Sequence, residues 1–104
     1  MSQNFRPYYA VIFTSKLTRS TEGYDEMASE MEDLASKQPG YLGFESARSG
    51  LGISISYWKS LDDIRSWKSH VDHLKAQKLG RSKWYESYKV RICKIEREYS
   101  FESS

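Results

Sequence analysis

The segment that decides the fold covers residues 53–73, which read ISISYWKSLDDIRSWKSHVDH. Its first residues alternate between isoleucine and serine and end on Tyr57 and Trp58, a period-two pattern typical of a β-strand. Ser60 and Asp63 then have the spacing of a helix N-cap. The apolar residues that follow share one face of a helix: Leu61, Ile64, Trp67, Val71 and Leu74. The segment therefore predicts a strand followed directly by an amphipathic helix.

The same helix carries a second capping pattern. Ser69 and Asp72 repeat the spacing of Ser60 and Asp63 nine residues later. Two such signals so close together predict a helix that breaks or kinks near Ser69 and restarts. Gly80 is expected to end it.

The flanking segments supply four more elements. Residues 8–14 are β-branched and aromatic, which favours a strand, and their nearly continuous apolarity favours a central one. A helical period follows from Tyr24 to Ala35, with Ser20 or Thr21 as its expected cap and Pro39-Gly40 as its stop. Further strands are predicted at 41–48, joined to 53–58 through a turn at 49–52. The pattern of Tyr85, Tyr88, Val90 and Ile92 leads into a long last strand, with Ile95 on its opposite face.

This order, β-α-β-β-α-β, predicts an α+β, ferredoxin-like fold with an antiparallel sheet and both helices on one face. The other sheet face would then carry apolar side chains that nothing in the chain covers. A second copy of the chain is the natural cover, so we expect a homodimer packed sheet against sheet.

Length and composition limit the classes of protein. A chain of 104 residues is expected to form a single domain over 1–104, with its core over about 8–99. The net charge of +2 is too balanced for an obligate nucleic-acid binder. The single cysteine fits a reducing compartment, and no signal-like or membrane-length apolar stretch is visible. We therefore expect a soluble cytoplasmic protein.

Three further segments resemble the antibiotic biosynthesis monooxygenase family, whose members are dimeric α+β barrels. They are QPGYLGFES at 38–46, SYWKSLDDIRSW at 56–67, and HVDH at 70–73 followed by the Arg81, Trp84, Tyr85, Tyr88, Val90, Arg91 pattern. The resemblance implies a dimer through the sheets and a pocket between helices and sheet. In oxygenase members it also implies O2 chemistry without a bound metal or flavin, in which a phenolic substrate supplies the electrons.

The resemblance transfers only in part. The haem-degrading members use an Asn, a Trp and a haem-ligating His, and their places here fall at or near Phe13, Trp67 and Gln77, which disfavours haem degradation. The quinone-forming members carry an Asn and a Tyr around the Trp, and those places fall near Asp63 and His73.

Helical geometry brings several of these residues together. At about 100° per residue, Asp63, Trp67, His70 and Gln77 lie along one edge of the buried stripe. We expect Trp67 and Trp58 to line a small-molecule pocket, with Tyr57, Arg65 and Gln77 as further substrate-binding residues. His70 or His73 would act as a general base on a phenolic substrate, because imidazole groups as a class titrate near neutral pH, with Asp63 as a third catalytic candidate.

Each candidate also has an ordinary structural explanation. Trp67 could be core, and the histidines could be surface or capping residues. His70 and His73 could share a metal ion, but the sequence places no third ligand, so no metal site and no cofactor are expected. Three hypotheses stay open: a cofactor-independent monooxygenase for a small aromatic compound, a non-catalytic protein that binds a small molecule or haem, and a dimer with no ligand.

Overall fold

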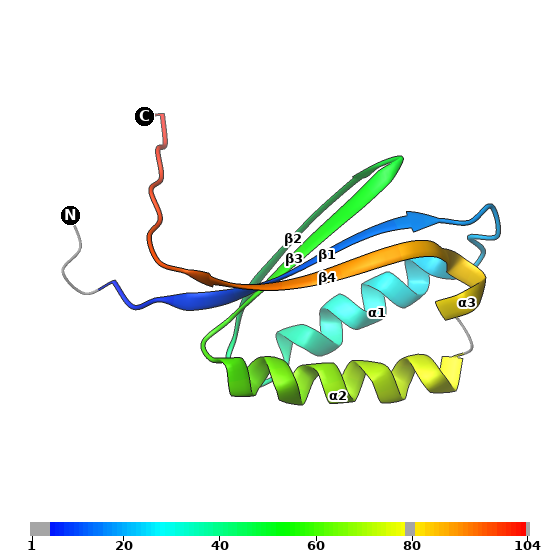
Figure 1. The fold of residues 1–104 in the computed structure, drawn as a ribbon, viewed down its shortest axis with the longest axis horizontal. Helices are drawn as coiled ribbons and strands as arrows, with labels where there is room; N and C mark the ends of the chain where they lie inside the picture. Colours follow the sequence, from blue (N-terminus) through cyan, green and yellow to red (C-terminus); the bar gives the residue numbers. More distant parts are fainter. Residues whose placement is uncertain (1–4, 79–80, 104) are drawn as a thin grey trace.

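The computed structural model describes residues 5–78 and 81–103, and within them the side chains of 5–72 and 83–103. The elements are β1 (Tyr8–Leu17), α1 (Tyr24–Ser36), β2 (Tyr41–Ser49), β3 (Leu51–Trp58), α2 (Leu61–Lys78), α3 (Arg81–Trp84) and β4 (Tyr85–Ile95). The antiparallel sheet has the order β2-β3-β1-β4, and α1 and α2 lie together on one side of it (Figure 1). The predicted ferredoxin-like fold is confirmed, with β1 in a central position.

Strand register decides which side chains face the helices. Tyr9 is the register partner of Trp58 in β3, and Tyr41 pairs with Trp58 from β2. Since directly opposed residues point to the same side of a sheet, these three share one face. They pack around the buried cluster of Ala35, Trp58 and Ile64, which joins β3 to both helices. We call this side the helix face and the other side the open face.

The β2–β3 connection is tighter than predicted. The strands continue to Ser49 and from Leu51, which are register partners, so Gly50 alone forms the bend. Its φ of +80° is a conformation that glycine adopts without strain. β1 also runs past Thr14 to Leu17, and its buried Ser15 hydroxyl accepts a hydrogen bond from Arg48 at 2.7 Å.

The predicted cap of α1 is wrong. Gly23 is the N-cap in a left-handed conformation, and no side chain caps the helix. The Trp84 indole fixes this turn instead, because its Nε1 donates to the Glu22 carbonyl at 2.8 Å. Ser20 is engaged elsewhere, where its backbone N–H donates to the Thr18 hydroxyl at 3.1 Å.

The predicted break in α2 is also wrong, because the helix is continuous from Leu61 to Lys78. Ser60 does cap it, accepting the backbone N–H of Asp63 at 3.1 Å. Asp72, expected to form the second cap with Ser69, lies instead within 3.2 Å of the Lys68 ammonium one turn earlier. Because the apolar period continues through Ser69, the helix continues as well, and Asp72 forms a surface ion pair with Lys68 instead of a cap. Within the described residues, no helix is long and apolar enough to cross a bilayer.

Candidate functional site

Three stacked rings lead from the core to the surface along α2. Trp58 has 0% of its surface exposed, and its indole N–H donates to the Ser56 hydroxyl at 2.8 Å. The half-buried Trp67 lies on it, with ring centroids 5.9 Å apart and planes at 26°. The exposed His70 stacks on Trp67 in turn, at 5.8 Å and 30°. The structure therefore brings Trp67 and His70 together, as predicted, and places Trp58 beneath them with no surface of its own.

An apolar strip on β4 lies on the same side of the sheet. Tyr88, Val90 and Ile92 are between 42% and 50% exposed, although they belong to the helix face. The assignment follows from register, because Ile92 pairs with Val11, which packs on the same core cluster as Trp67. The helices therefore leave this strip on the β4 edge exposed, beside Val11, which packs on the same core cluster as Trp67.

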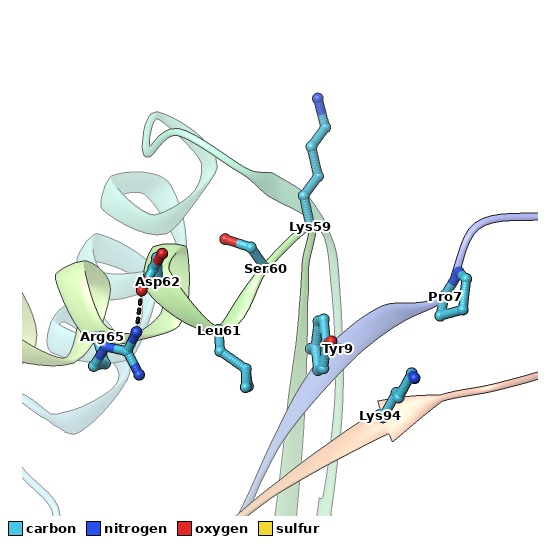
Figure 2. Close-up of a pocket in the computed structure, with 8 residues that line it drawn as sticks. All are labelled: Pro7, Tyr9, Lys59, Ser60, Leu61, Asp62, Arg65 and Lys94. Carbon is cyan, nitrogen blue, oxygen red and sulfur yellow. Dashed lines mark hydrogen bonds and ion pairs between the residues drawn. The ribbon is translucent and has the colours of Figure 1, made fainter.

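A pocket opens where α2 begins. It has a volume of 540 Å³ and is lined by Pro7, Tyr9, Lys59, Ser60, Leu61, Asp62, Arg65 and Lys94 (Figure 2). Arg65 is paired with Asp62 through its guanidinium, and Lys94 stands across the pocket on β4. Lys94 is the register partner of Tyr9, so it lies on the helix face two residues beyond Ile92. The apolar strip therefore leads toward a pocket rich in cations, which includes the predicted Arg65.

Asp63 is held at the start of α2. Its carboxylate accepts a hydrogen bond from the Ser60 hydroxyl at 2.9 Å. It also fills the space beside Gly40, where a Cβ would lie 2.0 Å from the Asp63 Oδ2. Asp63 thus has a capping and packing role in this structure, and its catalytic role stays a prediction.

Tyr57 is not part of the arrangement around Trp67. It precedes Trp58 in β3, so its side chain lies on the open face. There its hydroxyl donates to the Glu45 carboxylate at 2.8 Å, and its ring packs edge-on against Tyr8 at 5.8 Å. The hydrogen bond to Glu45, and then burial, raise the pKa of Tyr57. A direct contact between Tyr57 and a ligand at Trp67 of the same protomer would have to pass through the sheet.

Two candidates fall outside the described side chains, namely His73 and Gln77 in the last part of α2. Phe13, expected at or near the place of the Asn in the haem-degrading members, stacks on Tyr88 with ring centroids 5.2 Å apart. Within the part of the chain that the structure describes, no three His, Cys, Asp or Glu residues lie close enough together to hold a metal ion. The basic residues of β4 separate onto both faces, with Lys94 on the helix face and Arg91 on the open face.

Sequence reasoning missed the β4 strip, Tyr9 and Lys94 as lining residues. The alternation of Tyr88, Val90 and Ile92 marks a strand but does not say which side meets the helices. Pairing β4 with β1 fixes that side. The sequence does predict that Tyr57 and Trp58 point to opposite faces of β3, because they are neighbours in one strand, so they cannot both line one pocket.

The contact between Tyr8 and Glu98 gives a testable titration. The Tyr8 hydroxyl donates to the Glu98 carboxylate, and this bond, with burial second, raises the pKa of Tyr8 to about 12. A raised pKa means that the contact stabilises the fold at lower pH. That contribution is lost as the pH rises through about 12. We expect Glu98→Gln to move the Tyr8 titration back toward its ordinary value, as followed by tyrosinate absorbance. Glu102→Gln should leave it in place, and an unchanged Tyr8 titration in Glu98→Gln would contradict this assignment.

Comparisons with known proteins agree on the family. The profile of the antibiotic biosynthesis monooxygenase family matches residues 16–79. The uncharacterized protein YqjZ of Bacillus subtilis is 49% identical over 100 residues, which cover 94% of this chain and 88% of that protein.

Solved structures share the fold at low sequence identity. A variant of SnoaB, a cofactor-independent oxygenase from Streptomyces nogalater, superposes with a TM-score of 0.72 at 10% identity, covering 88% of this chain and 95% of its own. A Pseudomonas aeruginosa protein gives 0.70 at 13% identity, covering 90% and 97%. The profile match and the YqjZ relative establish that the chain belongs to the antibiotic biosynthesis monooxygenase family.

Proposed function

We propose that this protein is a cofactor-independent monooxygenase that acts on a small phenolic compound bound between α2 and β4. The observation that carries the proposal is the ring stack from Trp58 through Trp67 to His70. A flat aromatic ligand that extends this stack would lie on the outer side of the His70 imidazole, which Trp67 and the buried Trp58 support from beneath. Aromatic walls with one convergent titratable group are typical of small-molecule sites.

The β4 strip supports the aromatic nature of the ligand. Val90 and Ile92 are aliphatic and exposed, and they lie on the helix face of the sheet, against which Trp67 packs. Covering such a surface with an apolar ring removes it from water at about 25 cal/mol per Å². Lys94, which lines the pocket across from the Arg65–Asp62 ion pair, would favour a ligand with a phenolate or another acidic group, because opposite charges attract.

The proposed chemistry assigns one step to His70. Its imidazole would accept the phenolic proton, and the phenolate would donate electrons from its para carbon to O2. A peroxide formed at that carbon loses water to leave a quinone. The balance is one phenol plus one O2 giving one quinone plus one water, so the substrate supplies all the electrons. General bases in such positions contribute about 10²–10⁴-fold to rate.

The site can be tested by ligand titration. We expect α-naphthol, a phenol with a free para carbon, to quench indole fluorescence in a saturable way. Trp67→Leu should weaken this binding roughly tenfold or more, since the central ring of the stack is lost. Leu42→Ala removes an exposed apolar side chain from β2 and serves as the control. Equal affinity in Trp67→Leu and the wild type would place the ligand elsewhere.

A binding protein without turnover is the second candidate, and one observation favours it. The acidic groups near the start of α2 are already engaged, Asp63 by Ser60 and Asp62 by Arg65. Of the side chains described around Trp67, His70 alone is left as a base in ring contact with it. Saturable α-naphthol binding with no oxygen uptake would support this candidate over the oxygenase.

We also propose that the protein is a homodimer packed through the open face. Ile12, Ile53, Ile55 and Leu51 lie on this face, and Ile53 and Leu51 are exposed in the single chain. Two sheets packed face to face would remove this apolar surface from water. Light scattering at micromolar concentration should give twice the chain mass of 12.2 kDa. A monomer mass would contradict the dimer.

A further inference from the structure

The last residues of the chain form an extended arm that leaves the end of β4. In Figure 1 the arm turns to the side of the sheet opposite α1 and α2. It carries two large aromatic side chains in water, Tyr99 at 86% and Phe101 at 88% exposure. Two such side chains close together on an extended segment mark a contact surface, because soluble proteins rarely leave contiguous aromatic surface bare.

The arm has the pattern of a half-buried strand. Tyr99 and Phe101 are two residues apart, so they point to one side of an extended chain. Glu96, Glu98 and Glu102 alternate with them and point to the other side. Arg97, nearer the root, falls on the side of Tyr99 and Phe101. From Tyr99 onward the arm therefore has an apolar side and a polar side with Glu102, which is the composition of a strand laid on another surface.

The root of the arm is fixed in direction. Tyr8 holds Glu98 through its hydroxyl, and Tyr8 itself packs against Tyr57 on the open face at 5.8 Å. The arm therefore leaves its own sheet from the open face, at the end of the strands where Tyr8 pairs with Ile95.

The surface that complements the arm lies at the other end of the same face. Leu51 is the register partner of Lys16, and Ile53 that of Thr14, so both lie far from the Tyr8 end. A two-fold axis perpendicular to the strands, between two facing sheets, would bring the arm's root in one copy over this end of the other. From Ile95 to Phe101 an extended chain spans about 20 Å, which is enough to run along most of β3.

Charge favours the same arrangement. Lys89 pairs with Thr14 and Arg91 pairs with Ile12, so both cations are on the open face beside the apolar residues. Lys16 adds a third at the Leu51 end. Residues 96–103 carry three glutamates and one arginine, so the arm's net charge of −2 is opposite in sign to that of a patch bordered by these cations.

We propose that the arm, residues 96–103, docks on the open face of a second copy of this chain, with Tyr99 and Phe101 against Leu51 and Ile53. The net negative charge of the arm then lies over a face bordered by cations. The proposal rests on the homodimer, and it is independent of the ligand and the reaction. It also gives the dimer an exchanged element, since each protomer would cover its partner with its own arm.

Sedimentation equilibrium tests the contribution of the arm in the full chain. We expect Tyr99→Ser combined with Phe101→Ser to raise the dimer dissociation constant roughly tenfold or more. Leu61→Ser removes an exposed apolar side chain from α2, on the opposite side of the sheet, and should leave the constant unchanged. A double variant that dimerises as tightly as the wild type would overturn the role of the arm and leave the dimer itself standing. A wild-type monomer would overturn both.

Cross-linking tests where the arm lies. A chain with Phe101→Cys is mixed with a chain with Leu51→Cys, both with Cys93→Ala to remove the native thiol. We expect oxidation to give a heterodimeric disulfide. The pair Phe101→Cys and Val90→Cys, whose second position is on the helix face, should give none. Equal cross-linking in both pairs, or none in the first, would overturn the proposed docking site.

Discussion

Replacing Trp58 by alanine is expected to lower the free energy of unfolding by about 3–5 kcal/mol, the range found for buried tryptophan. Trp58 has no exposed surface and stands at the centre of the cluster formed with Ala35 and Ile64. It also supports Trp67, so its loss removes the base of the ring stack. For a domain whose total stability is about 5–15 kcal/mol, the variant should be close to unfolding. Urea denaturation at fixed protein concentration measures the change.

Trp58→Phe provides the control for this prediction. It keeps an aromatic ring under Trp67 but removes the indole N–H that bonds Ser56. We expect a smaller loss, roughly 1–3 kcal/mol. A loss below about 1 kcal/mol in Trp58→Ala would mean that the cluster is not the core of the domain.

Gly40→Ala is expected to lower the free energy of unfolding by roughly 2–4 kcal/mol, from left-handed backbone strain and steric overlap together. Gly40 has a φ of +83°, and an added Cβ would lie 2.0 Å from Oδ2 and 2.8 Å from Cβ of Asp63. Asp63 cannot move freely, because its side chain and backbone are both bonded to Ser60. The added methyl group of Gly40→Ala would therefore push the turn before β2 away from the start of α2.

Two variants separate the causes. Gly50 has a similar φ of +80° but nothing within 4 Å of an added Cβ, so Gly50→Ala should show the strain alone, about 1 kcal/mol. Asp63→Ala in the Gly40→Ala background should recover part of the loss. Equal losses in Gly40→Ala and Gly50→Ala would contradict the overlap with Asp63.

The elements of the fold were predictable where local and long-range signals agree. The Ile-Ser alternation of 53–58 gave the correct strand, and the Ser60 cap gave the correct start of α2. Pro39-Gly40 ended α1 as expected, since α1 stops at Ser36. In these places one residue type satisfies both the local backbone and the packing.

One error arose where a distant contact decides a local choice, and the other where two local signals competed. Gly23 caps α1 because Trp84, about sixty residues later, holds the preceding carbonyl. The capping pattern of Ser69 and Asp72 did not end the helix, because the apolar period of α2 continues past it and Asp72 forms an ion pair with Lys68. A window around Gly23 does not contain the information that decides its cap, whereas the signals that outweighed Ser69 lie within α2 itself.

The candidate site was predictable along one helix but not across elements. The helical spacing of about 100° per residue places Trp67 beside His70, and the structure brings these two rings together. The β4 strip and Lys94 depend on the register of β4 with β1. Tyr57 was grouped with Trp67 through sequence proximity alone, although strand parity sends it to the other face.

Oxygen uptake with α-naphthol tests the central claim most directly. The protein, treated with chelator and free of flavin, is mixed with the phenol and isotopically labelled O2. We predict one O2 consumed for each naphthoquinone formed, with one labelled atom in the quinone and the other in water. His70→Gln should bind the phenol, but its rate of oxygen uptake should fall by a factor of roughly 10² or more. Saturable binding with no oxygen uptake above that of the phenol alone would contradict an oxygenase.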